Sequence, residues 1–109
     1  MSTEKGTSLF DQGRYDEAKA EFEKALKQNP NDAGAHNGLG RVALIERRYE
    51  DAERAFREAV KLSEKEPVYH HNLGLALQNL KRYEEAEKEF RVALEGYPPA
   101  RSALGGVVL

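Results

Sequence analysis

Three histidines are the side chains best suited to chemistry near neutral pH, but their spacing argues against a shared metal ion. His36 and His70 stand 34 residues apart, in equivalent positions of two successive helical units. In stacked units their rings would be roughly 10 Å apart or more, about one helix diameter, which is too far for one ion. His70 and His71 are sequence neighbours and point in different directions on a helix. We therefore interpret His36 and His70 as packing residues where helices cross.

The other residue types give no catalytic arrangement. The chain contains no cysteine, which excludes disulfides, thiolate zinc sites and cysteine nucleophiles. Glycines are isolated apart from Gly105-Gly106, so no phosphate-cradling loop is present. No serine has the surroundings of a nucleophile elbow, as the sequence around each of them shows: Ser2, Ser8, Ser63 and Ser102. We predict no catalytic residue, no cofactor and no metal, and therefore no enzyme.

Charge and hydropathy narrow the classes of partner. The 17 lysines and arginines alternate with 19 aspartates and glutamates, and the formal net charge is −2. Nucleic acid binding usually needs a basic face, and the sequence gives no sign of one. No apolar run approaches the roughly 20 residues that span a bilayer, and the N-terminus has no signal-peptide character. We expect a soluble, cytoplasmic protein that binds neither nucleic acid nor membrane.

A shift of 34 residues aligns the chain with itself without a gap. The matching positions keep one residue type in all three units: Gly6, Gly40 and Gly74; Arg14, Arg48 and Arg82; Tyr15, Tyr49 and Tyr83; Ala18, Ala52 and Ala86; Phe22, Phe56 and Phe90; Ala25, Ala59 and Ala93. Self-similarity at this period is the signature of a helical repeat protein.

Each unit has the pattern of two helices. In the second unit, apolar residues at i, i+3, i+4 and i+7 predict a helix over about 33–45, with Asp32 as its N-cap. A break at Arg47-Arg48 precedes a second helix over about 50–63. Pro67 suits the first turn of the helix that follows.

Small residues indicate how the two helices pack. Gly40 lies in the middle of a helix, where glycine costs about 1 kcal/mol relative to alanine. This loss is tolerable if another helix passes too close for a side chain. We expect Ala52 to provide the facing small surface and Phe56 to fill the wider gap one turn further on. The third unit repeats this arrangement with Gly74, Ala86 and Phe90.

These columns resemble the tetratricopeptide repeat family over about residues 2–100. The resemblance is carried by the Leu-Gly pairs at 39–40 and 73–74, the tyrosines, the Ala-Phe-Ala series, Pro30 and Pro98. It implies an all-α, right-handed solenoid of three helical hairpins, at about 1–32, 33–66 and 67–100. Members of the family typically bind peptides or protein surfaces in a concave groove and serve as scaffolds or adaptors.

The chain departs from the family pattern in several places. Lys5 stands where the later units have leucine, so the first helix is expected to fray. Glu64 replaces a usual proline, so the helix that ends near 63 is expected to run on slightly. Pro98 and Pro99 would stop the last helix. Residues 101–109 would form a short apolar tail or the beginning of a truncated further helix.

The family geometry implies that the first helix of each unit lines the groove. The candidate peptide-binding residues are then Thr7 and Phe10, with Thr3; Asn37, Arg41 and Leu44, with Ile45; and His71, Asn72, Leu75, Gln78 and Asn79. Amides could bond a peptide backbone while apolar pockets receive its side chains. The plainer interpretation is an ordinary wet concave surface.

One subtype of the family grips the C-terminal carboxylate of chaperone tails through lysine, asparagine and arginine side chains. The matching positions here are Thr3, Thr7, Gly38, Val68 and Asn72, and none carries a positive charge. We therefore predict that this chain does not bind chaperone tails by that mechanism.

A second hypothesis is a self-associating structural module. Phe90, Leu94 and Tyr97, next to the apolar tail, would form a poorly covered end of the last hairpin. Exposed apolar patches of a few hundred Å² usually mark contact sites. The third unit of one copy could then stack on the first unit of another to give a homo-oligomer.

Overall fold

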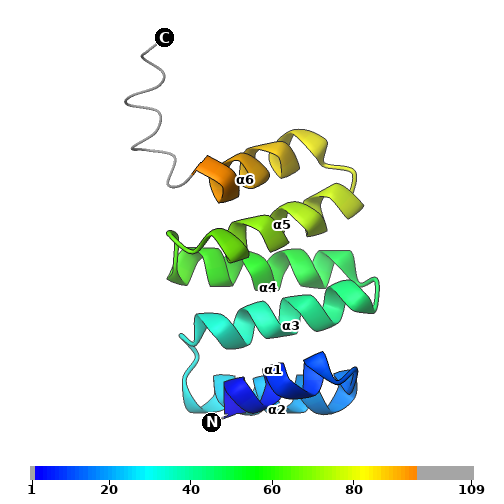
Figure 1. Cartoon of the computed structure of the whole chain (residues 1–109), viewed down its shortest axis with the longest axis vertical. Coiled ribbons are helices and arrows are strands. Elements are labelled where there is room, and N and C mark those ends of the chain that lie inside the picture. Colours follow the sequence, from blue (N-terminus) through cyan, green and yellow to red (C-terminus); the bar gives the residue numbers. More distant parts are fainter. Residues whose placement is uncertain (1, 96–109) are drawn as a thin grey trace.

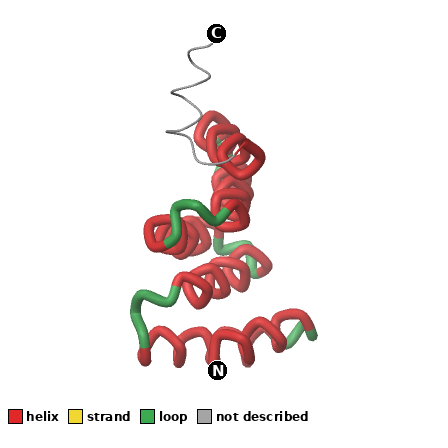
Figure 2. The backbone as a smooth tube through the Cα atoms, turned by 60° about the vertical axis from the view of Figure 1, so that its left-hand side comes forward, coloured by secondary structure: helices red, strands yellow, loops and turns green. Residues whose placement is uncertain are grey.

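The computed structural model describes residues 2–95, and these form helices joined by short turns (Figure 1). The helices follow one another along the chain: α1 (Ser2–Asp11), α2 (Tyr15–Gln28), α3 (Ala33–Ile45), α4 (Tyr49–Leu62), α5 (Pro67–Asn79) and α6 (Tyr83–Glu95). They pair into three hairpins, α1 with α2, α3 with α4, and α5 with α6, stacked in chain order (Figure 2). The described chain is therefore an all-α solenoid, as the repeat predicts.

Helix boundaries follow from local chemistry at each end. The Asp32 carboxylate accepts a hydrogen bond from the Ala35 N–H at 3.1 Å, which confirms the N-cap of α3. Pro67 begins α5, where its missing N–H would have had no helical partner. The predicted break at Arg47-Arg48 is confirmed as the turn between α3 and α4.

Each hairpin turns through one residue with positive φ, and these residues also lie 34 positions apart. They are Gly13 (φ 79°), Arg47 (φ 64°) and Lys81 (φ 65°). Around Arg47, the Arg48 N–H bonds the Ala43 carbonyl and the Arg47 N–H bonds the Leu44 carbonyl. This pattern closes a helix with a left-handed residue, a conformation that glycine adopts most easily.

One expected boundary is wrong. Helix α4 ends at Leu62 and does not run on through Glu64. Ser63 already has non-helical backbone angles (φ −145°, ψ 75°), close to those of Asn29 at the end of α2. The chain leaves the helix before it reaches the position of the missing proline, so that proline is not needed to stop it. The stop expected at Pro98 and Pro99 and the tail at 101–109 lie outside the described residues.

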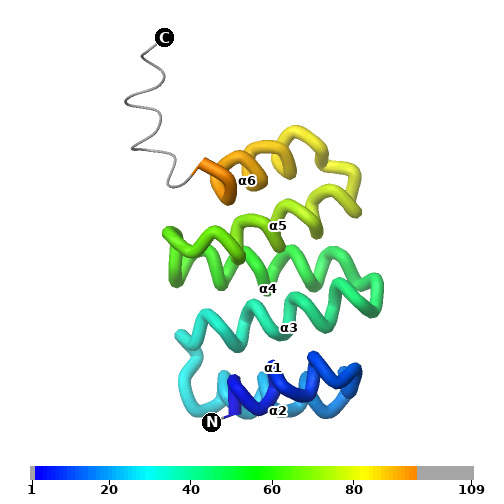
Figure 3. The backbone as a smooth tube through the Cα atoms, viewed as in Figure 1, coloured from blue at the N-terminus to red at the C-terminus, as the bar shows by residue number. Residues whose placement is uncertain are grey.

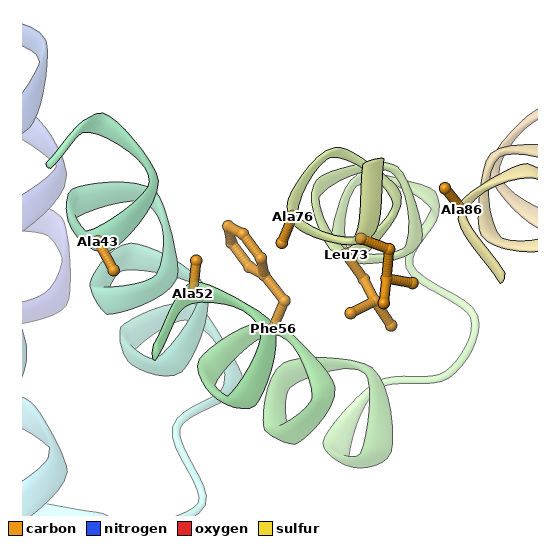
Figure 4. Close-up of a cluster of buried hydrophobic side chains, with 7 residues drawn as sticks. Ala43, Ala52, Phe56, Leu73, Ala76 and Ala86 are labelled. Carbon is orange, nitrogen blue, oxygen red and sulfur yellow. The ribbon is translucent and has the colours of Figure 1, made fainter. Parts of the chain in front are cut away.

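Phenylalanine rings, not alanines, cover the helical glycines. A β-carbon added to Gly40 would lie 2.5 Å from the Phe56 ring, and one added to Gly74 would lie 2.6 Å from the Phe90 ring. The expectation that the ring fills a gap one turn further on is therefore wrong, because the side chain reaches back over the glycine. Figure 4 shows the Phe56 ring between Ala52 of its own helix and Ala76 of α5. The glycine is needed because an aromatic ring crosses there.

The first helix of each hairpin forms a continuous inner row. Helix α3 touches α1 and α5 as well as α2 and α4, whereas the backbones of the described outer helices α2, α4 and α6 stay apart from one another (Figure 3). Ion pairs nevertheless join α4 to the last hairpin, between Arg57 and Glu85 at 3.4 Å and between Arg82 and Glu53 at 3.0 Å. The hydrogen bond from Arg82 lowers the pKa of the Glu85 carboxyl. Because α3 contacts both α1 and α5, these three helices together form one face of the molecule.

Candidate functional site

Nine of the twelve groove residues that the sequence singled out lie on the inner row in a regular pattern. On α1, α3 and α5 they recur at i, i+4 and i+7, the spacing of one helix face. The 34-residue period gives three rows that cross the helices: Thr3, Asn37 and His71; Thr7, Arg41 and Leu75; Phe10, Leu44 and Gln78. We call these nine positions the inner grid.

A hydrogen bond between two amides links Asn37 of the inner grid, on α3, to Asn72, which follows the grid residue His71 on α5. The Asn72 Nδ2 donates to the Asn37 Oδ1 at 2.8 Å. Each amide has two donor hydrogens and an acceptor oxygen, so this bond leaves the Asn37 NH2 and the Asn72 oxygen free to bond elsewhere. Both residues are half-buried. A peptide backbone that crosses α3 and α5 could bond both groups, because its carbonyl oxygen can accept from the Asn37 NH2 and its N–H can donate to the Asn72 oxygen.

Arg41 lies at the centre of the inner grid, on an aromatic ring. Its guanidinium carbon is 4.2 Å from the centroid of the Phe10 ring on α1. Phe10 is in turn held edge-on by Tyr15, with 5.1 Å between their ring centroids. Contact of a guanidinium with a ring face is favourable by about 0.5–1 kcal/mol at exposed sites. The stack orients the Arg41 side chain across the α1–α3 boundary.

Several predicted site residues are already engaged within the protein. Thr3 donates its hydroxyl to the Asp32 carboxylate at 2.6 Å, and Thr7 donates to the Thr3 carbonyl at 3.1 Å. The Asn79 amide donates to the Leu75 carbonyl of its own helix at 2.8 Å. Leu44 packs against the buried core of the second and third units. These side chains shape the inner grid more than they offer free hydrogen-bonding groups.

Other predicted residues lie at its border. The His71 ring is exposed and tilts against Phe90, with ring centroids 5.4 Å apart. Gln78 and Ile45 are exposed at the other end of their helices.

Burial, followed by the nearby carboxylates of Glu66 and Asp32, raises the pKa of Tyr69 at the start of α5, so its hydroxyl stays protonated.

The two packing histidines have a polar role that the sequence reasoning missed. His70 is buried, with Nδ1 2.7 Å from the Glu89 carboxylate and Nε2 2.6 Å from the Glu64 carbonyl. His36 makes the equivalent contact, with Nε2 2.9 Å from the Pro30 carbonyl. The sequence did carry a signal for this role. In two units a histidine follows, six residues later, the loop residue whose carbonyl it contacts, Pro30 or Glu64. These rings fasten the loops between hairpins, and within residues 2–95 no cluster of His, Asp and Glu could hold a metal ion.

The opposite side of the stack has a shallow hollow that the sequence did not indicate. It lies between α2 and α4, over Leu39, Val42 and Ala43 of α3. Its rim mixes basic and acidic side chains: Lys19, Arg48 and Arg54 with Glu23, Asp51 and Glu58. A rim of balanced charge does not select one class of ligand.

No helix within residues 2–95 combines the length and apolarity that crossing a membrane requires.

Stacked two-helix units of constant period define a helical repeat protein of the α-solenoid class. The sequence pattern of the tetratricopeptide repeat matches residues 3–67 and again residues 47–101. The chain therefore belongs to the tetratricopeptide repeat family, a fold of protein–protein interaction whose members are generally non-catalytic. No curated protein matches the chain.

Solved structures of the same fold superimpose closely. The first tetratricopeptide repeat domain of Spaghetti (RPAP3), bound to the HSP90 peptide SRMEEVD, is 28% identical, with a TM-score of 0.82 over 86% of this chain and 75% of that one. The first such domain of human RPAP3 is 28% identical, with a TM-score of 0.81 over 86% and 74%. The Arabidopsis OM64 domain is 26% identical, with a TM-score of 0.80 over 85% and 77%.

Proposed function

We propose that the chain binds an extended peptide segment of a partner protein across the inner grid and acts as a non-catalytic adaptor. The bond between Asn37 and Asn72 carries this proposal, because it orients a free amide donor and a free amide oxygen over adjacent helices. A peptide backbone offers the matching carbonyl and N–H. Half-buried Leu75 and Phe10 supply apolar contacts in the other two rows of the inner grid. The similar Spaghetti domain binds a peptide, which supports the class of partner.

Selection of random peptides from a display library tests this proposal. We expect the wild-type protein to enrich related peptides and the Asn72→Ala variant to bind a selected peptide about tenfold more weakly, since one or two hydrogen bonds are lost. Asn79→Ala is the matched control, because the Asn79 amide is bonded to its own helix. Isothermal titration gives the affinities, and urea unfolding checks that both variants fold. Failure to enrich any peptide, or equal loss in both variants, contradicts the proposal.

The same face lacks the features of a chaperone-tail clamp. At the clamp positions, Thr3 is bonded to Asp32, and any side chain at Gly38 would overlap the Phe22 ring. Val68 and Asn72 are uncharged. A peptide carboxylate would therefore meet no cation at these positions, and the nearby Asp32 would repel it.

Titration with the peptide SRMEEVD should consequently give no micromolar binding that depends on the terminal carboxylate of the peptide. The Spaghetti domain, whose structure contains this peptide, serves as the positive control. A micromolar dissociation constant for this chain that is lost when the peptide C-terminus is amidated would contradict the prediction, because it would assign the binding to a terminal-carboxylate clamp.

Self-association through α6 is a second candidate function. Leu94 is 86% exposed, whereas the equivalent Leu26 and Val60 pack against the buried cores. Helix α1 is a poor partner for this face because it presents Lys5, with 67% of that side chain exposed, where α3 and α5 present leucine. A second copy is therefore expected to pack its own α6 against the α6 of the first copy, in a contact with two-fold symmetry. Tyr97, also implicated by the sequence, lies outside the described residues.

Sedimentation over a wide concentration range tests this candidate. A dimer that Leu94→Lys converts to a monomer would support it. A wild-type monomer at the highest concentration would remove it, with no consequence for peptide binding.

A further inference from the structure

Arg41 differs from most other arginines in what it contacts. Six described arginines have a carboxylate within ion-pair distance: Arg14, Arg48, Arg54, Arg57, Arg82 and Arg91. Among residues 2–95, no carboxylate pairs with Arg41. The contact made by its guanidinium is the one with the Phe10 ring face. The donors at the edge of that planar group remain available to an incoming acceptor.

The surroundings of Arg41 make its charge stand out. Charged residues are 33% of the sequence, yet α3 and α5 together contain one formally charged side chain, Arg41. It is half-buried, so its charge is less screened by water than that of the exposed arginines on the outer helices. On α3 and α5 a ligand would therefore meet a single fixed positive charge among amides and apolar groups, whereas α1 also carries Glu4, Lys5 and Asp11.

The position of Arg41 also bears on which part of a ligand it meets. Thr7 on α1 and Leu75 on α5 flank it in the middle row of the inner grid, and α3 lies between and touches both helices. A peptide that crosses the three helices extends beyond Arg41 in both directions. The group opposite Arg41 is then a side chain within the peptide and not its terminal carboxylate.

We propose that the inner grid selects peptides with an internal acidic residue, aspartate or glutamate, whose carboxylate pairs with Arg41 while Phe10 holds the guanidinium in place. This inference rests on the proposed peptide binding and adds the chemistry of one ligand position. Guanidinium and carboxylate can form two parallel hydrogen bonds, which gives directional as well as electrostatic preference. Exposed aspartates and glutamates are abundant on α2, α4 and α6, so an acidic peptide is favoured on the inner row over the outer helices.

A display library of random heptapeptides with fixed flanking sequences at both ends tests the inference, because no displayed peptide then has a free C-terminus near the face. We expect the wild-type protein to enrich an acidic residue at one position. The Arg41→Glu variant should enrich lysine or arginine there. Lys24→Glu is the matched control, since it makes the same change of charge on exposed α2 and should keep the wild-type preference. Circular dichroism confirms that the variants are folded.

A double-mutant cycle then assigns the contact to Arg41. Exchanging the acidic residue of a selected peptide for its amide should weaken binding to the wild type about two- to fivefold, the range for a partly exposed charge pair. The same exchange should have no effect on Arg41→Gln. Enriched peptides without an acidic position, or an acidic preference that survives Arg41→Glu, would overturn the inference and leave peptide binding intact. Absence of any enriched peptide would overturn the proposed function together with it.

Discussion

Replacing Phe56 by alanine is expected to lower the free energy of unfolding by about 4 kcal/mol. The ring is fully buried, lies over Gly40 of α3 and packs with Ala76 and Leu73 of α5. It therefore contributes both to its own hairpin and to the junction with the next one. A domain of this size has a total stability of about 5–15 kcal/mol, so the variant would be close to unfolding at room temperature. Urea unfolding followed by circular dichroism measures the loss.

Phe90→Ala provides the matched comparison for Phe56→Ala. Phe90 occupies the same column and lies over Gly74, but it is only half-buried at the outer face of the last hairpin. Its removal should cost about 2 kcal/mol, because less apolar surface leaves water when the chain folds. Equal losses for the two variants would contradict the expectation that the fully buried Phe56 stabilises the fold more than the half-buried Phe90.

Gly38→Ala is expected to destabilise the protein by about 2 kcal/mol, although alanine is the better helix former. A β-carbon at Gly38 would overlap the Phe22 ring, which is fully buried. The ring cannot withdraw, because its other side lies against Gly6, where a β-carbon would be 2.7 Å away. The added methyl group must therefore push α3 away from α2. Such a shift also moves the adjacent Asn37 relative to Asn72, so peptide binding should weaken in the same variant.

Gly34→Ala on the same helix is the control for this effect. Its β-carbon would lie 3.3 Å from the Thr3 methyl and 3.4 Å from the Asp32 carboxylate, contacts that small movements relieve. We expect a change in unfolding free energy within about 0.5 kcal/mol of zero, because helix propensity offsets the tight contacts. A Gly38→Ala protein as stable as Gly34→Ala would contradict the account of the first junction.

The period of 34 residues made much of the fold predictable. Helix α3 begins and ends at the residues expected from its apolar spacing and from Asp32. Both signals are local, since a cap and a helical face depend on residues a few positions apart. The error at Glu64 has the same origin. A family preference for proline was treated as necessary, whereas the non-helical backbone at Ser63 already ends α4.

The candidate site was predictable as positions but not as interactions. The resemblance to the family placed Asn37, Arg41 and Asn72 on the inner row, and the spacing extended this placement from unit to unit, because equivalent residues of a repeat occupy equivalent faces. It could not show that Asn79 bonds its own helix or that Asn72 reaches Asn37. These outcomes depend on side-chain torsions and on the distance between neighbouring helices, which no periodicity encodes.

The sequence by itself determined that this protein is a stack of helical hairpins, because each unit repeats the same apolar, small and aromatic positions and cannot bury them alone. The tertiary structure decided how the units meet. Phe22 lies between Gly6 and Gly38, His70 joins the loop before α5 to Glu89 of α6, and Arg41 rests on Phe10 without a carboxylate partner in the described chain. Each of these arrangements joins residues from different elements of the fold, so it exists only once the helices have packed.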